Sequence, residues 1–443
     1  MLGVQGAQIA VLDPFDRFDI LDIGEMRDSP ARAAKSAGFI TSLQHVRRRH
    51  YRRGMSQSRY AGLSRAELAI LVPELLLIGQ LIDRSGMAWC IQAFGREEML
   101  QIAIEEWAAA SPIYTKRMQQ ALNFAGDDVP TIFKGLQLDI GAPPQFMDFR
   151  FTIHDRWHGE FRLDHCGALL DVEPMGDEYV FGMCHTIEDP TFDATAVATN
   201  PRAQVRPIHR PPRVPPDRHP HCAWTVVIDE SHPAARGIPA LDVVAQSKAA
   251  SWELAAIDPA DDGLADYAGP LLSDLDFGAF SHSALVRVAD EICLQMHLLY
   301  LSFAIAVGKR AGADTELARS IGTRQLIGIA GLAAERIHRA LALPAGIDGV
   351  LRVFELHPLF NPAGYIEAEI TGDRLLLHRS PGHDDAAWIS LCTPESGQPL
   401  QAIATAVDPH VAVRVGGTNT GGPPSWRKPR PRHPNCRRCW WPR

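Results

Sequence analysis

The stretch that decides the fold is "QALNFAGDDVPTIFKGLQLDIGAPPQFMDF" at 120–149, because a second version of it, "RALALPAGIDGVLRVFELHPLFNPAGYIEA", returns at 339–368. The two stretches align at an offset of about 219 residues, which brings Pro143 opposite Pro362 and places an Ala-Leu pair in both. Self-similarity at a fixed spacing is the sequence signature of a repeated structural unit. The stretch therefore predicts that one unit of the fold occurs twice.

Further agreements follow in the same order along the chain. They are "GEFRLDH" (159–165) with "GDRLLLH" (372–378), "ATAVATNPRAQVR" (194–206) with "AIATAVDPHVAVR" (402–414), and Cys184 with Cys392. The offset shrinks in steps from about 219 to 208, as loop deletions would produce. We therefore expect an internal duplication with a first unit at 55–235 and a second, degenerate unit at 236–415.

Each unit is predicted to begin with long helices and to continue with short antiparallel strands. Apolar residues recur at helical spacing over about 64–82, 95–125, 282–308 and 315–342. Alternating segments predict the strands "FMDFRFTI", "EFRLDHC" and "YVFGMC" in the first unit and "YIEAEI", "RLLLH" and "WISLC" in the second. A short helix, "FDATAVATN" or "PLQAIATAV", then precedes one more strand. Helices followed by a strand meander indicate an α+β fold.

The two ends of the chain differ in character from this body. "QHVRRRHYRRG" (44–54) has five arginines and no apolar period, and Met55 follows it directly, so we expect 1–54 to be a disordered or non-native extension. The first unit closes with a Pro-rich loop and the strand "CAWTVVID", whereas the second unit has the basic tail 416–443 in that place. We expect this tail to be disordered and altered. Its "CRRC" offers only half of a zinc site.

Charge and cysteine content narrow the classes of function. With the two basic ends set aside, 55–415 holds 28 basic and 46 acidic residues, a net charge of −18, which argues against nucleic acid as a partner. Eight irregularly spaced cysteines suit a reducing compartment, so we expect a cytoplasmic protein. The apolar run Ile292–Gly308 contains Gln295 and His297, which favours a buried helix over a membrane span.

Candidate chemistry concentrates in the first unit, where three thiol–imidazole neighbours occur. They are His165–Cys166, Cys184–His185 and His221–Cys222. One interpretation is a structural zinc whose candidate ligands are Cys166, Cys184, His185, His209, His219, His221 and Cys222. Against it, no close CxxC or HxxxH pair occurs among them, and adjacent residues of a strand point to opposite faces. We therefore expect no metal cofactor, with zinc kept as the alternative.

A catalytic thiol is the second interpretation. Cys184 precedes "HTIEDP", which suggests a strand-to-helix turn where the helix dipole and a neighbouring imidazole would lower the thiol pKa. Cys166 is the second nucleophile candidate, since it has no counterpart in the second unit. The proposed bases or acids are His185, His221 and Glu188, and the proposed substrate-binding residues are Arg206, Arg210, Arg213 and His209. The third interpretation is that these thiols and imidazoles simply fill a core.

The order of these motifs resembles a known family. Helices, a strand meander with "DHCG", then "MCHTIEDP", and a Pro-rich stretch before "HCAW" look like the L-2-amino-thiazoline-4-carboxylic acid hydrolase-like family. Its general layout is similar to ligand-binding domains of the 4-vinyl-reductase type. The resemblance covers about 64–230 directly and 282–415 through the repeat. It implies ring-opening hydrolysis of a small cyclic amidine carboxylate by a Cys/His site, with an arginine on the carboxylate.

We therefore expect a hydrolase-like enzyme that acts on a small cyclic amidine or amide through the Cys/His site of the first unit. The alternative is a non-catalytic small-molecule-binding or assembly module, built as a pseudo-dimer of the two units. In both cases the expected partner is a small molecule rather than nucleic acid or membrane, and self-association into a homo-oligomer remains open.

Overall fold

The computed structural model describes residues 21–25 and 57–416. The expectations about Met55 and about "CRRC" lie outside the described residues. Helix accounts for 55% and strand for 13% of the structure, and every sheet pairing is antiparallel. This confirms the predicted α+β class.

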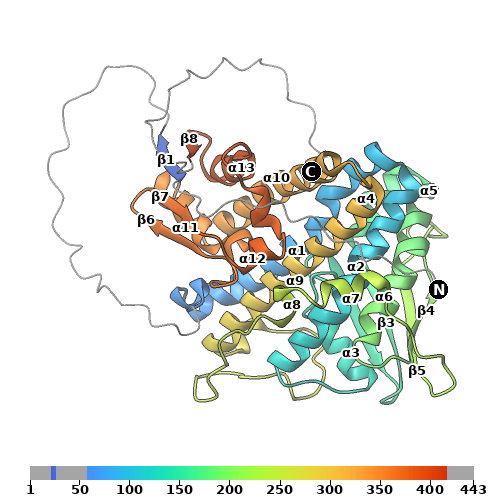
Figure 1. Cartoon of the computed structure of the whole chain (residues 1–443). Coiled ribbons are helices and arrows are strands. Elements are labelled where there is room, and N and C mark those ends of the chain that lie inside the picture. The colour runs from blue at the N-terminus through green and yellow to red at the C-terminus, as the bar shows by residue number, and fades with distance from the viewer. Residues whose placement is uncertain (1–20, 26–56, 417–443) are drawn as a thin grey trace, which may run out of the picture.

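Four long helices cross the middle of the molecule (Figure 1). They are α1 (Arg65–Phe94), α2 (Arg96–Ala121), α9 (His282–Ala311) and α10 (Thr315–Ala340). The last three are close to the predicted ranges, whereas α1 continues twelve residues beyond its predicted end at 82. A capping box fixes the start of α1: the Ser64 hydroxyl accepts the Glu67 backbone N–H at 3.2 Å, and the Glu67 carboxylate accepts the Ser64 N–H at 2.7 Å. Helix α1 packs on α10, α2 packs on α9, and α1 and α9 also contact each other.

Helix α9 contains a long apolar window. By length and composition it is the one described helix that could cross a membrane, and 83% of its apolar window is buried inside the protein. Two of its buried polar side chains are hydrogen-bonded to backbone carbonyls of other segments: His297 Nε2 pairs with the Asn361 carbonyl at 2.8 Å, and the Gln295 amide donates to the Leu138 carbonyl at 3.0 Å. These contacts are those of a core helix.

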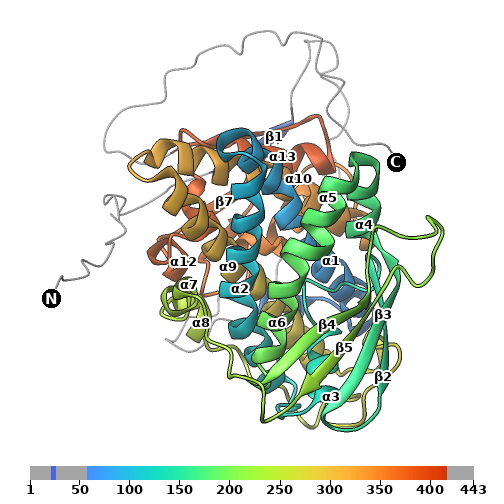
Figure 2. The ribbon, with the colours of Figure 1, turned by 90° about the vertical axis from the view of Figure 1, so that its right-hand side faces the viewer.

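The first sheet has the order β2-β3-β5-β4. Its strands are β2 (Met147–Ile153), β3 (His158–Cys166), β4 (Ala203–His209) and β5 (Cys222–Ile228). Helices α3 (Val129–Leu136) and α6 (Glu188–Val197) cover its inner face. On that face Phe192 of α6 packs between Phe161 and Trp224, with ring centroids 5.2 and 5.0 Å away. The opposite face carries mostly polar side chains, as alternation along a half-buried strand requires. Figure 2 shows this sheet with α6 beside it.

The second sheet has the order β6-β7-β1-β8. Its strands are β1 (Leu21–Glu25), β6 (Ala368–Thr371), β7 (Arg374–Leu377) and β8 (Val411–Val415). It packs against α11 (Ile347–Leu356) and α13 (Gln398–Val407). Strand β1 lies between β7 and β8, the position that β5 has in the first sheet. The closing strand that seemed to be missing from the second unit is therefore supplied from 21–25, within the expected N-terminal extension.

Two predicted strands are helical instead, and this is a correction. "YVFGMC" forms α5 (Asp177–Phe181) and the first half of a π-helical turn, η3 (Gly182–Ile187), while "WISLC" forms the 3₁₀ turn η6 (Trp388–Leu391). In the first case the buried residues include Val180, Cys184 and Ile187, which recur at helical spacing. Cys184 therefore lies inside a continuous helical run that leads into α6, not at the start of a helix after a strand.

The remaining helical segments are short and connect these elements. They are η1 (Arg59–Gly62), α4 (Gly167–Val172), η2 (Glu173–Met175), α7 (Pro239–Val244), α8 (Lys248–Ser251), η4 (Phe277–Ala279), η5 (Pro358–Phe360) and α12 (Pro381–Asp384). The long helices and the second sheet share one hydrophobic core, and the first sheet has a second core beneath it. The space between these two cores holds the candidate site.

Candidate ligand-binding cavity

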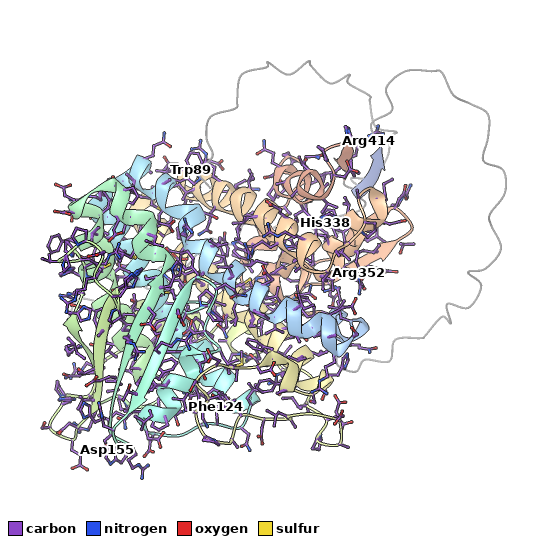
Figure 3. All side chains as sticks on the ribbon, turned by 180° about the vertical axis from the view of Figure 1, so that it is seen from behind. Trp89, Phe124, Asp155, His338, Arg352 and Arg414 are labelled. Atoms are coloured by element: carbon purple, nitrogen blue, oxygen red, sulfur yellow. The ribbon has the colours of Figure 1, made fainter. Side chains whose placement is uncertain are left out.

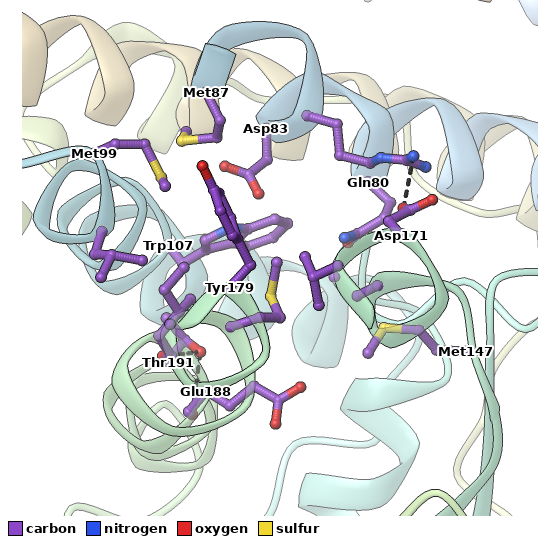
Figure 4. A pocket seen from close by; sticks show the side chains of 18 of the residues that line it. Gln80, Asp83, Met87, Met99, Trp107, Met147, Asp171, Tyr179, Glu188 and Thr191 are labelled. Atoms are coloured by element: carbon purple, nitrogen blue, oxygen red, sulfur yellow. Dashed lines mark hydrogen bonds and ion pairs between the residues drawn. The ribbon is translucent and has the colours of Figure 1, made fainter. Parts of the chain in front are cut away.

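A cavity of about 280 Å³ lies between α1, α2 and the helical run from α4 to α6. Its wall is largely apolar and includes Trp107 and five of the ten methionines of the chain: Met87, Met99, Met147, Met175 and Met183. Methionine is unbranched and polarisable, so a wall rich in it adapts to ligands of different shape. Figure 4 shows Asp83, Trp107, Tyr179 and Glu188 converging on this space from α1, α2, α5 and α6.

Carboxyl groups interrupt the apolar wall. Asp83, Asp139, Asp171 and Glu188 line the cavity, and Glu106 lies beside Asp83. Asp171 is neutralised at one side by Arg84, at 2.6 Å (Figure 4). Asp83, Asp139, Glu188 and Glu106 form no ion pair with a cationic side chain of the described residues. Their charged forms are therefore destabilised by burial.

Asp83 and Glu106 act as a coupled acid pair. Asp83 is 7% exposed, and burial raises its pKa from 3.8 to about 6 despite a hydrogen bond with Glu106. Glu106 is fully buried, and its pKa is raised well above the ordinary value by burial and then by the charge of Asp83. At neutral pH the pair therefore holds one proton, which stays on Glu106 while Asp83 is ionised.

Glu188 is a second acid of the cavity that burial holds mainly in its neutral form. It is 7% exposed, and burial, followed by the neighbouring charge of Asp189, raises its pKa from 4.5 to about 8. Its Oε2 atom makes no hydrogen bond within the protein. At pH 7 it is therefore mostly a carboxylic acid, which can donate one hydrogen bond into the cavity.

Asp139 is better satisfied than the other acids. It accepts the Tyr114 hydroxyl at 2.8 Å and the Gly141 backbone N–H at 2.7 Å. These bonds partly offset its burial, which raises the pKa to about 6. Asp139 thus closes the far wall as a fixed hydrogen-bonded group, whereas Gln80 Oε1 and Asp83 Oδ1 are buried with no partner in the protein.

The predicted thiols lie together outside the cavity. Cys166, Cys184 and Cys222 are buried in the core beneath the first sheet, next to Glu188. Burial and then Glu188 raise the pKa of Cys166 to about 12, and the same two causes raise the pKa values of Cys184 and Cys222 well above the ordinary value of a thiol. The pKa of Cys184 is therefore raised, whereas the sequence interpretation expected it to be lowered. The reason is that the thiol is buried in the core and does not lie at the N-terminus of a helix.

The predicted imidazoles make structural contacts. His185 Nε2 pairs with the Pro211 carbonyl at 2.7 Å, and its ring lies 4.5 Å from that of Phe181. His221 is buried, with its ring 5.0 Å from that of His219, and its pKa is lowered by burial and then by Arg213. The pKa of His209 is also lowered, chiefly by burial. None of these imidazoles lines the cavity.

The three predicted anchor arginines are already paired with carboxylates. They are Arg206 with Asp193 at 2.9 Å, Arg210 with Asp189, and Arg213 with Glu173 through two bonds of 2.8 Å. These pairs tie β4 and the Pro-rich loop to α6 and η2. Of the nine predicted site residues, Glu188 alone lines the cavity.

Sequence reasoning missed Asp83, Glu106 and Gln80, although a signal was present. Each falls on the buried stripe of its helix, three or four residues from apolar neighbours such as Leu76 or Ile102. An ionisable residue on a buried stripe is expensive, so it marks a site. Comparison with known proteins adds no assignment: no protein-family model, no curated protein and no solved structure matches this chain.

Proposed function

We propose that this protein binds a small molecule with an apolar body and a basic, hydrogen-bonding nitrogen group, such as a cyclic amidine or an amine. The observation that carries this proposal is the set of unpartnered oxygens, Gln80 Oε1, Asp83 Oδ1 and Glu188 Oε2, around one apolar cavity. Buried acceptors without partners are costly, so a ligand that donates N–H groups to them gains more than an apolar ligand of the same shape.

Charge favours the same ligand class. Asp83 is the acid of the coupled pair that ionises. Among the described residues, Arg84 is the one cation that lowers its pKa, and Arg84 is paired with Asp171. A cationic nitrogen bound beside Asp83 would supply the missing countercharge and lower the Asp83 pKa again. Because Asp83 must be ionised for this, affinity should rise as pH increases through about 6.

Binding of benzamidine, measured by isothermal titration calorimetry at pH 5.5 and 7.5, tests the proposal. We expect affinity at pH 7.5 to be higher, and Asp83→Asn to weaken binding about ten-fold or more, since it removes a desolvated charge. Gln80→Leu is a second variant of nearly the same size. Asp177→Asn, an exposed acid at the start of α5, is the matched control. Equal affinity for benzamidine and for uncharged toluene would contradict the proposal.

Hydrolysis in the same cavity is the second candidate, and one observation favours it. Asp83 and Glu188 face one space with pKa values of about 6 and about 8, on opposite sides of neutrality. Such a pair suits a base that takes a proton from water and an acid that protonates a leaving nitrogen. This chemistry agrees with the resemblance to cyclic-amidine hydrolases, but uses carboxyl groups in place of a thiol.

Turnover of 2-amino-thiazoline-4-carboxylate by purified protein would test the hydrolase proposal. We expect Glu188→Gln to abolish turnover and Cys184→Ser to preserve it. The reverse result would restore the thiol as nucleophile. If the protein binds benzamidine but neither the unaltered chain nor any variant turns the substrate over, the binding proposal stands and the hydrolase proposal is rejected.

We also propose that the two halves derive from a duplication and that only the first keeps a ligand cavity. In support, α1 and α9 both have 30 residues, α2 and α10 both have 26, and the contacts α1–α10 and α2–α9 are mutually equivalent.

Aligning α1 with α9 from their first residues sets Asp83 opposite Tyr300 and Gln80 opposite His297. Those two side chains pack on Trp388, with ring centroids 5.5 and 5.8 Å away. At these positions the second half is therefore filled by packed aromatic rings, whereas the first half has polar side chains that line a cavity. We expect one ligand per chain by calorimetry, and a stoichiometry of two would contradict this assignment.

A further inference from the structure

We propose that the hairpin joining β2 and β3 binds a divalent transition-metal ion through His154, His158 and Glu160. The potential ligand atoms of these three side chains all lie within 4.8 Å of one another. The sequence carries them as "HDRWHGE", a His-x₃-His-x-Glu pattern just before the segment in which thiol–imidazole pairs were sought. This site is separate from the cavity, whose wall includes none of the three.

Strand register explains why the three side chains share one face. Thr152 is opposite Glu160 and Ile153 is opposite Gly159, so Glu160 and His158 alternate with Gly159 along β3. Gly159 faces inward, where an added Cβ would come within 2.9 Å of Val129 and Phe133. His158 and Glu160 therefore face outward, and His154 continues the outward-facing row of β2.

The backbone of the hairpin is already fixed by its own hydrogen bonds. The backbone N–H of His154 donates to the His158 carbonyl at 3.0 Å. The Asp155 carboxylate accepts the backbone N–H groups of Trp157 at 2.7 Å and His158 at 3.0 Å. Figure 3 shows Asp155 at the outer end of the molecule. Metal binding at this tip would require side-chain movement only, which keeps the ordering cost low.

The donor set selects the class of metal. His154 Nε2 lies 3.2 Å from a Glu160 carboxylate oxygen, and the two imidazole rings lie 4.6 Å apart. Tetrahedral zinc with bonds of about 2.1 Å holds its ligand atoms about 3.4 Å apart, so a modest contraction suffices. Two imidazoles and one carboxylate suit Zn²⁺, Cu²⁺, Ni²⁺ or Co²⁺ rather than Mg²⁺ or Ca²⁺.

The coordination shell would be incomplete on the protein side. Three protein ligands leave at least one position of a tetrahedral ion to water, as in sites that exchange ligands. His154 is exposed and the other two ligands are half-buried, so this open position faces solvent. The ion would therefore exchange readily with chelators and accept a ligand from outside.

The test uses the full chain without a histidine tag, stripped of metal by a chelator and then titrated with Zn²⁺ against a chromophoric competitor. We expect one tight Zn²⁺ per chain and a loss of about ten-fold or more in affinity for His154→Ala, His158→Ala and Glu160→Gln. His165→Ala, an exposed histidine on the same strand, is the matched control. Acidification should weaken Zn²⁺ binding, because protons compete for the imidazoles.

Two results would overturn the proposal. One is a triple variant, His154→Ala, His158→Ala and Glu160→Gln, that binds Zn²⁺ as tightly as the unaltered chain. The other is a loss of Zn²⁺ affinity in His165→Ala, which would move the ion to the histidines around His221. Circular dichroism of each variant separates loss of ligands from loss of fold. A Zn²⁺-dependent rise in melting temperature, present in the unaltered chain and absent in the triple variant, gives a second measure.

Discussion

Replacing Glu188 with glutamine should flatten the dependence of stability on pH. Burial raises the pKa of this carboxyl from 4.5 to about 8. Below pH 4.5 the folded and unfolded states are both protonated at this position. As pH rises, the unfolded state loses its proton first, so folding becomes less favourable until the folded state also ionises near pH 8. The expected loss is about 1.4 kcal/mol per pH unit over this window, or about 5 kcal/mol in total.

Glutamine has nearly the same volume and does not titrate, so the variant should lack this loss. Urea unfolding at pH 5 and pH 8 measures it. Between these values we expect the unaltered protein to lose about 3 kcal/mol more stability than Glu188→Gln. The coupled acids Asp83 and Glu106 are present in both proteins, so their effect cancels in the difference.

Glu178→Gln is the matched control for this measurement. It makes the same substitution in the same helical run, at a side chain that is 80% exposed, and should behave as the unaltered chain does. If Glu188→Gln keeps the full pH dependence of the unaltered protein, the argument from burial is refuted.

Two further predictions concern the first sheet. Cys184 is 2% exposed and its thiol pKa is raised. Iodoacetamide at pH 7.5 should therefore label it far more slowly in the folded than in the unfolded protein. Rapid labelling of Cys184 alone in the folded protein, detected by mass spectrometry, would contradict this. Gly159→Ala should lower the free energy of unfolding by about 1–3 kcal/mol, because the added Cβ would lie 2.8 Å from Val129. Gly62→Ala, which meets no atom within 4 Å, is its control, and equal stability of the two variants in urea would rule out the overpacking.

The long helices could be predicted because their signals are local. The Ser64–Glu67 capping box and the apolar period of α1 need no knowledge of the rest of the chain. The strand prediction for "YVFGMC" was wrong because six residues are too few to distinguish the apolar period of a strand from that of a helix. Val180, Gly182 and Cys184 fit the alternation of a strand, while Val180, Cys184 and Ile187 fit a helix. Only packing beneath the first sheet decides between them.

The site was harder to predict than the fold for a related reason. Glu188 was a site candidate because of its place in "HTIEDP", and it lines the cavity, but its surroundings come from α1 and α2, about 80 to 100 residues earlier in the chain. Thiol–imidazole neighbours in sequence drew attention to Cys184 and His185, yet adjacent residues on a helical run point in different directions. A cavity is a property of how elements pack, and no single segment encodes it.

The position of β1 has a consequence for how the chain is made. All four strands of the first sheet lie within Met147–Ile228, so that sheet can form while the ribosome is still adding the second half. The second sheet joins Leu21 to Val415, nearly the two extremes of the chain, and β8 has β1 as its sole neighbour among the described strands. Its completion must await the synthesis of β8, and contacts between such distant segments form slowly. Until then the edge of β1 that pairs with β8 remains free, and the β8 strand of another copy of the chain offers the same antiparallel partner.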